Sequence, residues 1–381
     1  MQRPDPDRLR ALLDDLRVWA RGIPVQGSDR YGAMCAGLAD DPERASLILL
    51  ARPGFQNPLI LLAAVHHLLL EGERHPLAAY YATLVGDAAR PADEGLYPVF
   101  AEFVDAHRAR LTDLVVARTT QTNEARRTVV TLPAFGIVAQ AAGAPLALLE
   151  VGASAGLNLL VDRYAFRIGA TPAGSQGSSA RFACDVEGEL RPPVPPRVDI
   201  AWRLGLDLNP LDVRDPETRA WLRALVWPEH PDRLAMLDAA LDVARPDPPL
   251  VLRGDLVDDL ASLSALAPTG AALTVVATWT LAYLEAKRRR AFVARLAEVA
   301  ASDRRSVWLV AGEAESVLAS LEVGLGQMPA DGFGPSTLSL HRFDPDGRHE
   351  HVLLAHAHPH GRWIRWLDAA TAAGATADQP A

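Results

Sequence analysis

One stretch of the sequence, LALLEVGASAGLNLLVDRY at residues 146–164, constrains the fold more than any other. It begins with an apolar run that predicts a buried strand, and it continues through a loop of small residues, Gly152 to Gly156, into a run with helical character. A strand that turns tightly through glycines into a helix brings backbone N–H groups together at the edge of a sheet. The stretch therefore predicts a β–α unit with a ligand-binding corner at its turn.

The rest of the chain predicts an all-helical N-terminal domain at 1–140, an α/β domain at 141–370 and a disordered tail at 371–381. In the first domain, apolar residues recur at three- and four-residue spacing, as at residues 9–19. In the second, short apolar runs alternate with helical patterns, which is typical of a parallel sheet with crossover helices. The expected helices include 58–70, 99–116, 217–244 and 284–301. The expected strands are 146–151, 199–208, 250–253, 272–279 and 306–311, then a hairpin of 336–343 and 351–357, with an insertion of loops at 165–198.

The composition is that of a soluble globular protein. Of the 381 residues, 49% are hydrophobic and 22% are charged, and the net charge of −9 disfavours a nucleic-acid substrate. No apolar run resembles a secretory signal or is long enough to span a bilayer, so we expect a cytoplasmic protein without a membrane partner. Cys35 and Cys184 are too far apart in the sequence for a cysteine zinc site. Lys287 is the only lysine and follows no glycine loop, which excludes a Walker-type nucleotide site.

The loop after the first predicted strand fits two chemistries. It matches Gly-x-Ser-x-Gly, the nucleophile elbow of α/β serine hydrolases, with Ser154 as nucleophile and Asp255 and His356 as possible partners. The segment from Glu150 to Gly156 also resembles the first motif of class I S-adenosylmethionine-dependent methyltransferases, in which Ser154 would replace the middle of three glycines. A hydrolase elbow normally follows several strands, whereas this loop follows the first, so we favour the methyltransferase. A cofactor- or nucleotide-binding module without turnover and an ordinary β–α turn stay open.

The methyltransferase resemblance implies a fold, a cofactor and an activity. The fold is a Rossmann-like, mostly parallel, seven-stranded sheet that ends in an antiparallel hairpin, with the helical domain as lid and acceptor wall. The cofactor is S-adenosylmethionine, and the reaction is methyl transfer to a small-molecule or protein acceptor in a water-poor pocket. Neither the acceptor nor the oligomeric state follows from the sequence.

The same resemblance gives roles to residues near the predicted strand ends. Glu150 would lie beneath the methionine moiety, Asp207 would bind the ribose hydroxyls and Asp255 would approach the adenine. Each aspartate could instead cap a turn or a helix, and Trp279 could pack in the core. The predicted cofactor-binding residues are Glu150, Gly152, Ala153, Ser154, Gly156, Asn158, Asp207, Asn209, Asp255 and Thr278; Asn123, Arg127 and Trp279 are predicted to contact the acceptor, and Glu124 and Tyr283 are candidate general bases.

A polar run, TTQTNEARR at residues 119–127, stands directly before the α/β domain. Together with the glycine loop and the run DLNP at 207–210, it resembles an uncharacterised bacterial family, domain of unknown function 2332, over most of the chain. This resemblance adds an expectation of fold and no mechanism. The polar run could also be a helix cap with surface ion pairs.

Histidines gather towards the end of the chain. His349 and His351, and then His356, His358 and His360, alternate along the last predicted strand, and alternation places side chains on one face of a sheet. No acidic residue stands at a recognised ligand spacing from them, so we expect a solvated strand edge and no metal site.

Overall fold

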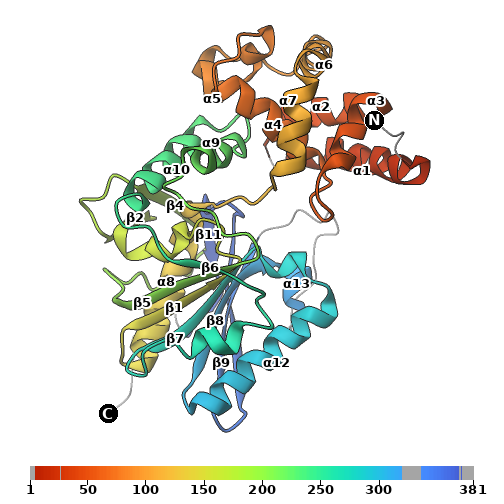
Figure 1. Cartoon of the computed structure of the whole chain (residues 1–381). Helices are drawn as coiled ribbons and strands as arrows, with labels where there is room; N and C mark the ends of the chain where they lie inside the picture. The colour runs from red at the N-terminus through yellow and green to blue at the C-terminus, as the bar shows by residue number, and fades with distance from the viewer. Residues whose placement is uncertain (1–4, 26, 320–335, 369, 371–381) are drawn as a thin grey trace. The chain divides into compact units, whose positions relative to one another are not determined.

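The computed structural model describes residues 5–25, 27–319, 336–368 and 370 (Figure 1). The chain divides into two compact units. The helical unit comprises Met1–Thr122 and Asp215–Asp238, and the sheet unit comprises Asn123–Arg214 and Ala239–Ala381. The tail predicted at 371–381 lies outside the described residues.

The helical unit contains only helices among its described residues. The apolar helix α4 spans Pro58–Leu70 as predicted and is buried along most of its length, with the side chain of Asn57 accepting a hydrogen bond from the Leu59 amide at its start. The helix predicted at 99–116 is two helices, because the chain leaves helical geometry at His107. The other elements are α1 (Pro6–Val25), α2 (Asp29–Ala39), α3 (Pro42–Ala45), η1 (Ser46–Leu50), η2 (Pro76–Tyr80), α5 (Ala82–Val85), η3 (Gly86–Ala88), α6 (Leu96–Ala106), α7 (Arg108–Ala117) and α9 (Pro216–Ala224).

Over its described residues, the sheet unit is built on one sheet of eleven strands, in the order β3-β2-β4-β11-β10-β9-β8-β7-β1-β5-β6. Six of its strand pairs are parallel and four are antiparallel. The mostly parallel α/β class is therefore confirmed, and the predicted number of seven strands is wrong. The strands are β1 (Leu146–Val151), β2 (Ala165–Ile168), β3 (Thr171–Gly174), β4 (Arg181–Glu187), β5 (Ile200–Asp207), β6 (Val251–Arg253), β7 (Ala272–Thr278), β8 (Val307–Ala314), β9 (Ser336–Phe343), β10 (His349–Ala357) and β11 (Trp363–Trp366).

Five neighbouring parallel strands, β6, β5, β1, β7 and β8, form one half of the sheet. Numbered by their order in the chain they run 3-2-1-4-5, so the chain first builds outward on one side of β1 and then on the other. This is the order of a doubly wound sheet, in which ligands bind outside the carboxyl ends of the strands where the direction changes. The loop Gly152 to Gly156 lies at that edge, directly after β1.

Different helices cover the two faces of these parallel strands. On one face, Leu149 and Val151 of β1 point into an apolar core shared with Phe292 and Leu296 of α12 (Ala286–Asp303). Because side chains alternate along a strand, Glu150 points to the other face, where α8 (Thr128–Ala142) packs on β1 and β7. That face carries the polar side chains described below.

Three of the four strands that the sequence did not predict lie in the segment 165–198. Two of them, β2 and β3, are only four residues long, and β3 contains Pro172 and Gly174, residues that are typical of loops. A cluster of rings packs at β2 and β4, where Tyr164, Phe166 and Phe182 lie 5.1–6.4 Å apart between centroids, and β3 joins the sheet by antiparallel pairing with β2. The fourth, β11, joins β4 to β10 and so completes the sheet.

Two predicted helices also differ. The segment after the glycine loop is η5 (Leu157–Arg163), a 3₁₀ helix with non-helical geometry at Leu160, and the helix predicted at 217–244 is split into α9 and α10 (Pro231–Ala244). Of the helices that the structure describes, none combines the length and apolar character needed to cross a bilayer. The remaining elements are η4 (Ala125–Arg127), α11 (Leu260–Ser264), η6 (Leu281–Tyr283) and α13 (Glu315–Ala319).

Candidate functional site

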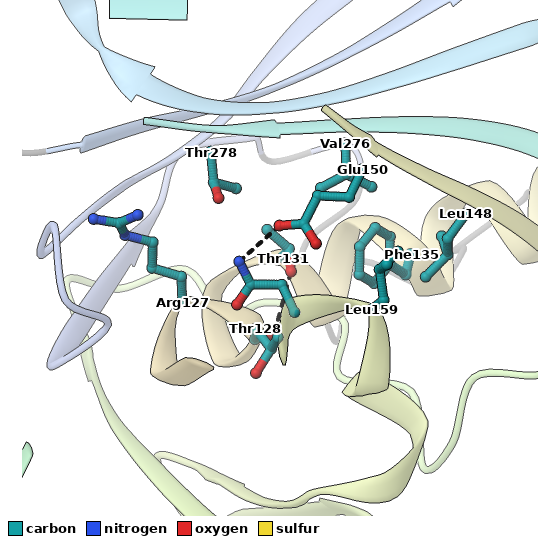
Figure 2. Close-up of a pocket in the computed structure, with 10 residues that line it drawn as sticks. Arg127, Thr128, Thr131, Phe135, Leu148, Glu150, Leu159, Val276 and Thr278 are labelled. Atoms are coloured by element: carbon teal, nitrogen blue, oxygen red, sulfur yellow. Dashed lines mark hydrogen bonds between the residues drawn. The ribbon is translucent and has the colours of Figure 1, made fainter. Parts of the chain in front are cut away.

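A small pocket lies within the sheet unit, on the α8 face and near the carboxyl ends of β1 and β7 (Figure 2). Its empty volume is about 260 Å³, including the part open to solvent. Four of the predicted site residues line it, although they come from three separate stretches of the sequence. The lining residues are Arg127, Thr128, Thr131, Phe135, Leu148, Glu150, Asn158, Leu159, Val276 and Thr278.

Glu150 is the most unusual group in this pocket. Its side chain, at the end of β1, is 2% exposed, and its Oε1 accepts a hydrogen bond of 2.8 Å from Asn158 Nδ2. Its Oε2 and the Asn158 Oδ1 are buried and have no hydrogen-bond partner among the described residues. Burial away from water raises the pKa of Glu150 to about 8, and the nearby charge of Asp207 adds to the rise. Figure 2 shows the Glu150 carboxyl group pointing into the pocket.

Arg127 and Trp279 form a pair beside Glu150. The Arg127 guanidinium lies 6.0 Å from the centroid of the Trp279 ring, within range of a cation–π contact, and its Nε donates to the Pro359 carbonyl at 3.0 Å. Trp279 directly follows β7 with φ at +54°, a strained backbone geometry for an aromatic residue. Its Nε1 is buried without a hydrogen-bond partner in the part of the chain that the structure describes. This strained turn holds the indole next to the arginine.

A second buried carboxyl group, Glu313, lies at the end of β8. Its Oε1 accepts hydrogen bonds from the amides of Thr280 and Leu281, at 2.7 and 2.8 Å, while no described residue provides a partner for its Oε2. Burial raises the pKa of Glu313 to about 7, and the two amides and the charge of Arg127 oppose that rise. The sheet unit thus carries two carboxyl groups that stay protonated to unusually high pH, each at the carboxyl end of a parallel strand.

The glycine loop is folded tightly onto the end of β5. The amides of Gly152 and Ala153 donate to the Leu206 carbonyl, and the Gly156 amide donates to the Ala153 carbonyl. Gly152 has φ at +69°, and a Cβ there would come within 2.3 Å of the Thr280 hydroxyl. Most of the loop amides that the sequence predicted to bind a ligand therefore donate hydrogen bonds within the chain.

Asp207 braces this loop from the end of β5. Its Oδ2 accepts from the Ser154 amide at 2.8 Å and its Oδ1 from the Asn209 amide at 2.7 Å. This is the turn-capping arrangement that the sequence left open for Asp207. A ribose could reach this carboxylate only by sharing or replacing these amide contacts.

Four other predicted residues do not line the pocket, and three of them have structural contacts. Asn123 Oδ1 accepts from the Leu157 amide at 3.0 Å and so caps η5, and Asp255 Oδ1 accepts from two amides of a turn and pairs with Arg288. The Glu124 carboxylate lies 3.5 Å from His360 Nδ1, and Tyr283 is 77% exposed. The cap interpretation of Asp255 is the one that the geometry matches, although α11 begins only at Leu260.

The described residues do not form the serine–histidine–aspartate contacts of a serine hydrolase. The Ser154 hydroxyl is buried and has no hydrogen-bond partner there, so no histidine lies within reach of it as a base. His356 Nδ1 lies instead 3.3 Å from the Thr337 hydroxyl. The φ of Ser154, +54°, resembles that of a nucleophile elbow, but the strand before Ser154 is the first described strand of the chain.

Sequence reasoning missed the contribution of α8 and of β8 to this site. Thr128, Thr131 and Phe135 of α8 line the pocket because α8 packs on the face to which Glu150 points. Glu313 was missed because β8 continues three residues beyond the predicted strand end. An acidic residue directly after the apolar run SVWLVAG repeats the pattern at Glu150 and was the available signal.

A family model described as "Uncharacterized protein conserved in bacteria (DUF2332)" matches residues 14–366, and the chain belongs to this family. No curated protein and no solved structure matches the chain.

Proposed function

We propose that this member of the DUF2332 family binds S-adenosylmethionine in the pocket beside Glu150 and transfers its methyl group to a small-molecule or protein acceptor. One observation carries the proposal: Glu150 Oε2 and Asn158 Oδ1 are buried oxygens without a hydrogen-bond partner among the described residues. A buried polar atom without a partner costs free energy, so such a pair favours a ligand that brings N–H groups, from which both oxygens can accept once Glu150 has lost its proton. The ammonium group of the methionine moiety brings three.

The position of this pair in the sheet supports the same ligand. Glu150 lies at the carboxyl end of β1, the central strand of the 3-2-1-4-5 order, where doubly wound sheets bind nucleotide-like ligands, and Asn158 of η5 is hydrogen-bonded to it. Because the loop amides are engaged, the proposal relies on the side chains of the pocket to hold the methionine end.

The main contribution of the protein to this reaction would be to position the cofactor and the acceptor. S-adenosylmethionine supplies a methyl group that its sulfonium charge activates towards a nucleophile. Glu150 would ionise and pair with the ammonium, and Thr278 and Trp279 at the end of β7 would border the acceptor. Aligned reactants in a water-poor pocket provide most of the acceleration in such a transfer. For an acceptor that must lose a proton, Glu124, which is buried, and Tyr283, which is exposed, would be the candidate bases.

Calorimetry at pH 7, in two buffers of different ionisation enthalpy, tests the binding step. With a pKa of about 8, Glu150 is mostly protonated at this pH, so binding of the ammonium should release close to one proton. S-adenosylhomocysteine carries the same ammonium and should release the same proton. Glu150→Gln should weaken binding about 10- to 100-fold, the range for losing a charge-assisted hydrogen bond, and should abolish the proton release.

A matched control is Glu298→Gln, which removes an exposed carboxylate of α12 and should bind like the parent. No heat with either ligand, or unchanged binding by Glu150→Gln, would refute the proposal. Binding without methyl transfer to a broad panel of acceptors would instead favour the non-catalytic module. Labelling of Ser154 by a fluorophosphonate would favour the hydrolase.

A further inference from the structure

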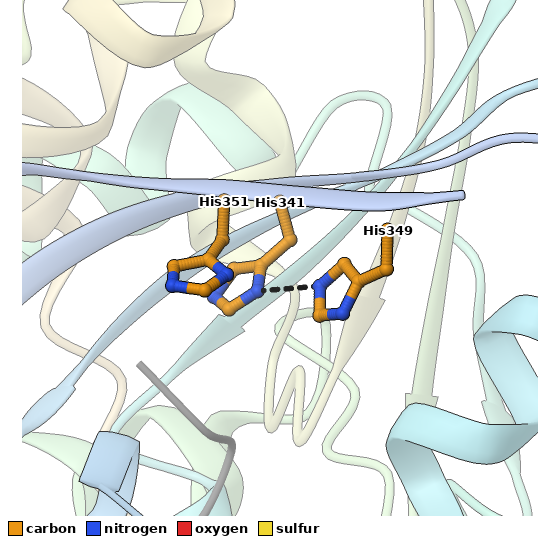
Figure 3. Close-up of side chains that lie close together, drawn as sticks. All are labelled: His341, His349 and His351. Carbon is orange, nitrogen blue, oxygen red and sulfur yellow. Dashed lines mark hydrogen bonds between the residues drawn. The ribbon is translucent and has the colours of Figure 1, made fainter. Parts of the chain in front are cut away.

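Three histidines meet on one face of the hairpin formed by β9 and β10 (Figure 3). His341 of β9 is the register partner of His351 of β10 in this antiparallel pair. His349 lies two residues before His351, and residues two apart on a strand share a face. The sequence pattern included His349 and His351 but not His341, which the register of the hairpin brings beside them.

The spacing of the ring nitrogens suits a shared metal ion. One nitrogen from each ring lies within 4.8 Å of the other two, and His341 Nδ1 and His349 Nε2 are 3.2 Å apart. Two imidazole nitrogens that bind one tetrahedral zinc ion at about 2.05 Å are separated by roughly 3.3 Å. The hairpin therefore already holds two nitrogens at the distance that a common ion would require.

Neighbouring side chains fix the orientation of two of these rings. The second nitrogen of His341, Nε2, lies 3.0 Å from the hydroxyl of the buried Ser339. When Nε2–H donates to that hydroxyl, Nδ1 keeps its lone pair and can ligate a metal; partners of this kind orient histidine ligands in metal sites. The Phe343 ring stacks against His349 with centroids 4.2 Å apart. Contacts that hold the rings before an ion arrives lower the entropic cost of binding.

We propose that His341, His349 and His351 bind one divalent transition-metal ion, with Zn²⁺ as the preferred candidate. Imidazole nitrogen suits this class of ion, and three protein ligands leave a further coordination position for water. Ions can enter because His349 and His351 are exposed. Of the described part of β10, only Ala355–Ala357 pairs with β11. The part of β10 that carries His349 and His351 is therefore not paired with β11.

This site is separate from the pocket beside Glu150. His341 lies opposite Leu309 of β8, which points into the core on the α12 face, whereas Glu150 points to the α8 face. Three strand spacings, from β1 through β7 and β8 to β9, add a lateral separation of about 14 Å. The metal proposal therefore does not depend on the proposed methyl transfer.

Titration of the full chain without a histidine tag, after treatment with a chelator, tests the site. Co²⁺ should bind one equivalent with the visible absorption of a tetrahedral complex, and Zn²⁺ should displace it. His349→Ala and His351→Ala should each lower the affinity at least tenfold, since even the loss of a partner that only orients a ligand costs 10- to 100-fold. Ser339→Ala should lower it within that 10- to 100-fold range.

The matched control is Glu350→Ala, which changes an exposed residue that lies between His349 and His351 and on the opposite face of the strand. It should bind metal like the parent, and circular dichroism should show that all variants fold. The proposal is overturned if the folded parent binds neither ion, if the His349→Ala/His351→Ala double variant binds as the parent does, or if only one of the two histidines matters.

Discussion

Replacing Glu150 by glutamine should change how the stability of the sheet unit depends on pH. Burial raises the pKa of Glu150 from 4.5 to about 8. In the unfolded chain this carboxyl group loses its proton near 4.5, whereas in the folded chain it keeps the proton until about pH 8. Between these values the folded state binds more protons than the unfolded state, so the free energy of unfolding falls as the pH rises. Stability from this group is complete below pH 4.5 and is lost through pH 8.

The magnitude follows from the same two values. The difference between 4.5 and about 8 corresponds to on the order of 5 kcal/mol over the whole interval. This is an upper limit, because water that enters the pocket would stabilise the ionised form. Glutamine keeps the shape of the side chain, and its carbonyl can still accept from Asn158 Nδ2, but it has no proton to lose. Relative to the parent, Glu150→Gln should thus gain up to about 5 kcal/mol of stability as the pH rises across this interval.

Urea unfolding at pH 5, 6, 7 and 8 provides the measurement, with hydrogen exchange to identify the transition of the sheet unit. The parent and Glu298→Gln should lose stability in parallel as the pH rises, and Glu150→Gln should lose much less. If the curves of the parent and Glu150→Gln stay parallel within about 0.5 kcal/mol, burial does not hold the proton on Glu150 and the reasoning is refuted.

Three further predictions concern the neighbourhood of the pocket. Glu313→Gln should show the same effect over the shorter interval from 4.5 to about 7, on the order of 3 kcal/mol in urea unfolding, and an unchanged pH profile would contradict it. Gly152→Ala should cost about 1–3 kcal/mol more in thermal unfolding than Gly143→Ala, since both glycines have positive φ but only Gly152 faces Thr280; equal losses would contradict the contact. Asn123→Ala should cost about 1 kcal/mol by removing the cap of η5, whereas Asn123→Asp should keep most of it, and urea unfolding in which both variants matched the parent would argue against the cap.

The sequence predicted the parallel strands well because each is a short apolar run between turn signals. The predicted bounds of β1 match the structure, and those of β5 differ by one residue at each end. It did not predict β2, β3, β4 and β11. Three of these are four residues each and gain stability from pairing with distant strands rather than from their own composition, and the seven-residue β4 lies in the segment that the sequence analysis interpreted as an insertion of loops. The seven-stranded expectation failed because these four strands were missed.

The sequence predicted the site residues that lie at or directly after strand ends. It did not predict the residues that tertiary packing or strand register brings to the site. Glu150 and Asn158 are eight residues apart in the sequence, and the predicted turn between them brings their side chains together. Thr131 enters the pocket only because α8 packs on that face of the sheet, which no local pattern specifies. His341 is a comparable case, since the register of a hairpin places it beside His349.

The two buried carboxyl groups differ in a way that points to Glu150 as the group that responds to a ligand. Glu313 already receives two backbone amides on one oxygen, and these donors partly offset its burial, which is why its pKa rises less. Glu150 receives a single side-chain amide, so its ionised form has less support within the protein. A cationic group placed against the second oxygen of Glu150 would therefore gain more than one placed at Glu313, because it would pair with an ionised carboxylate that burial otherwise disfavours.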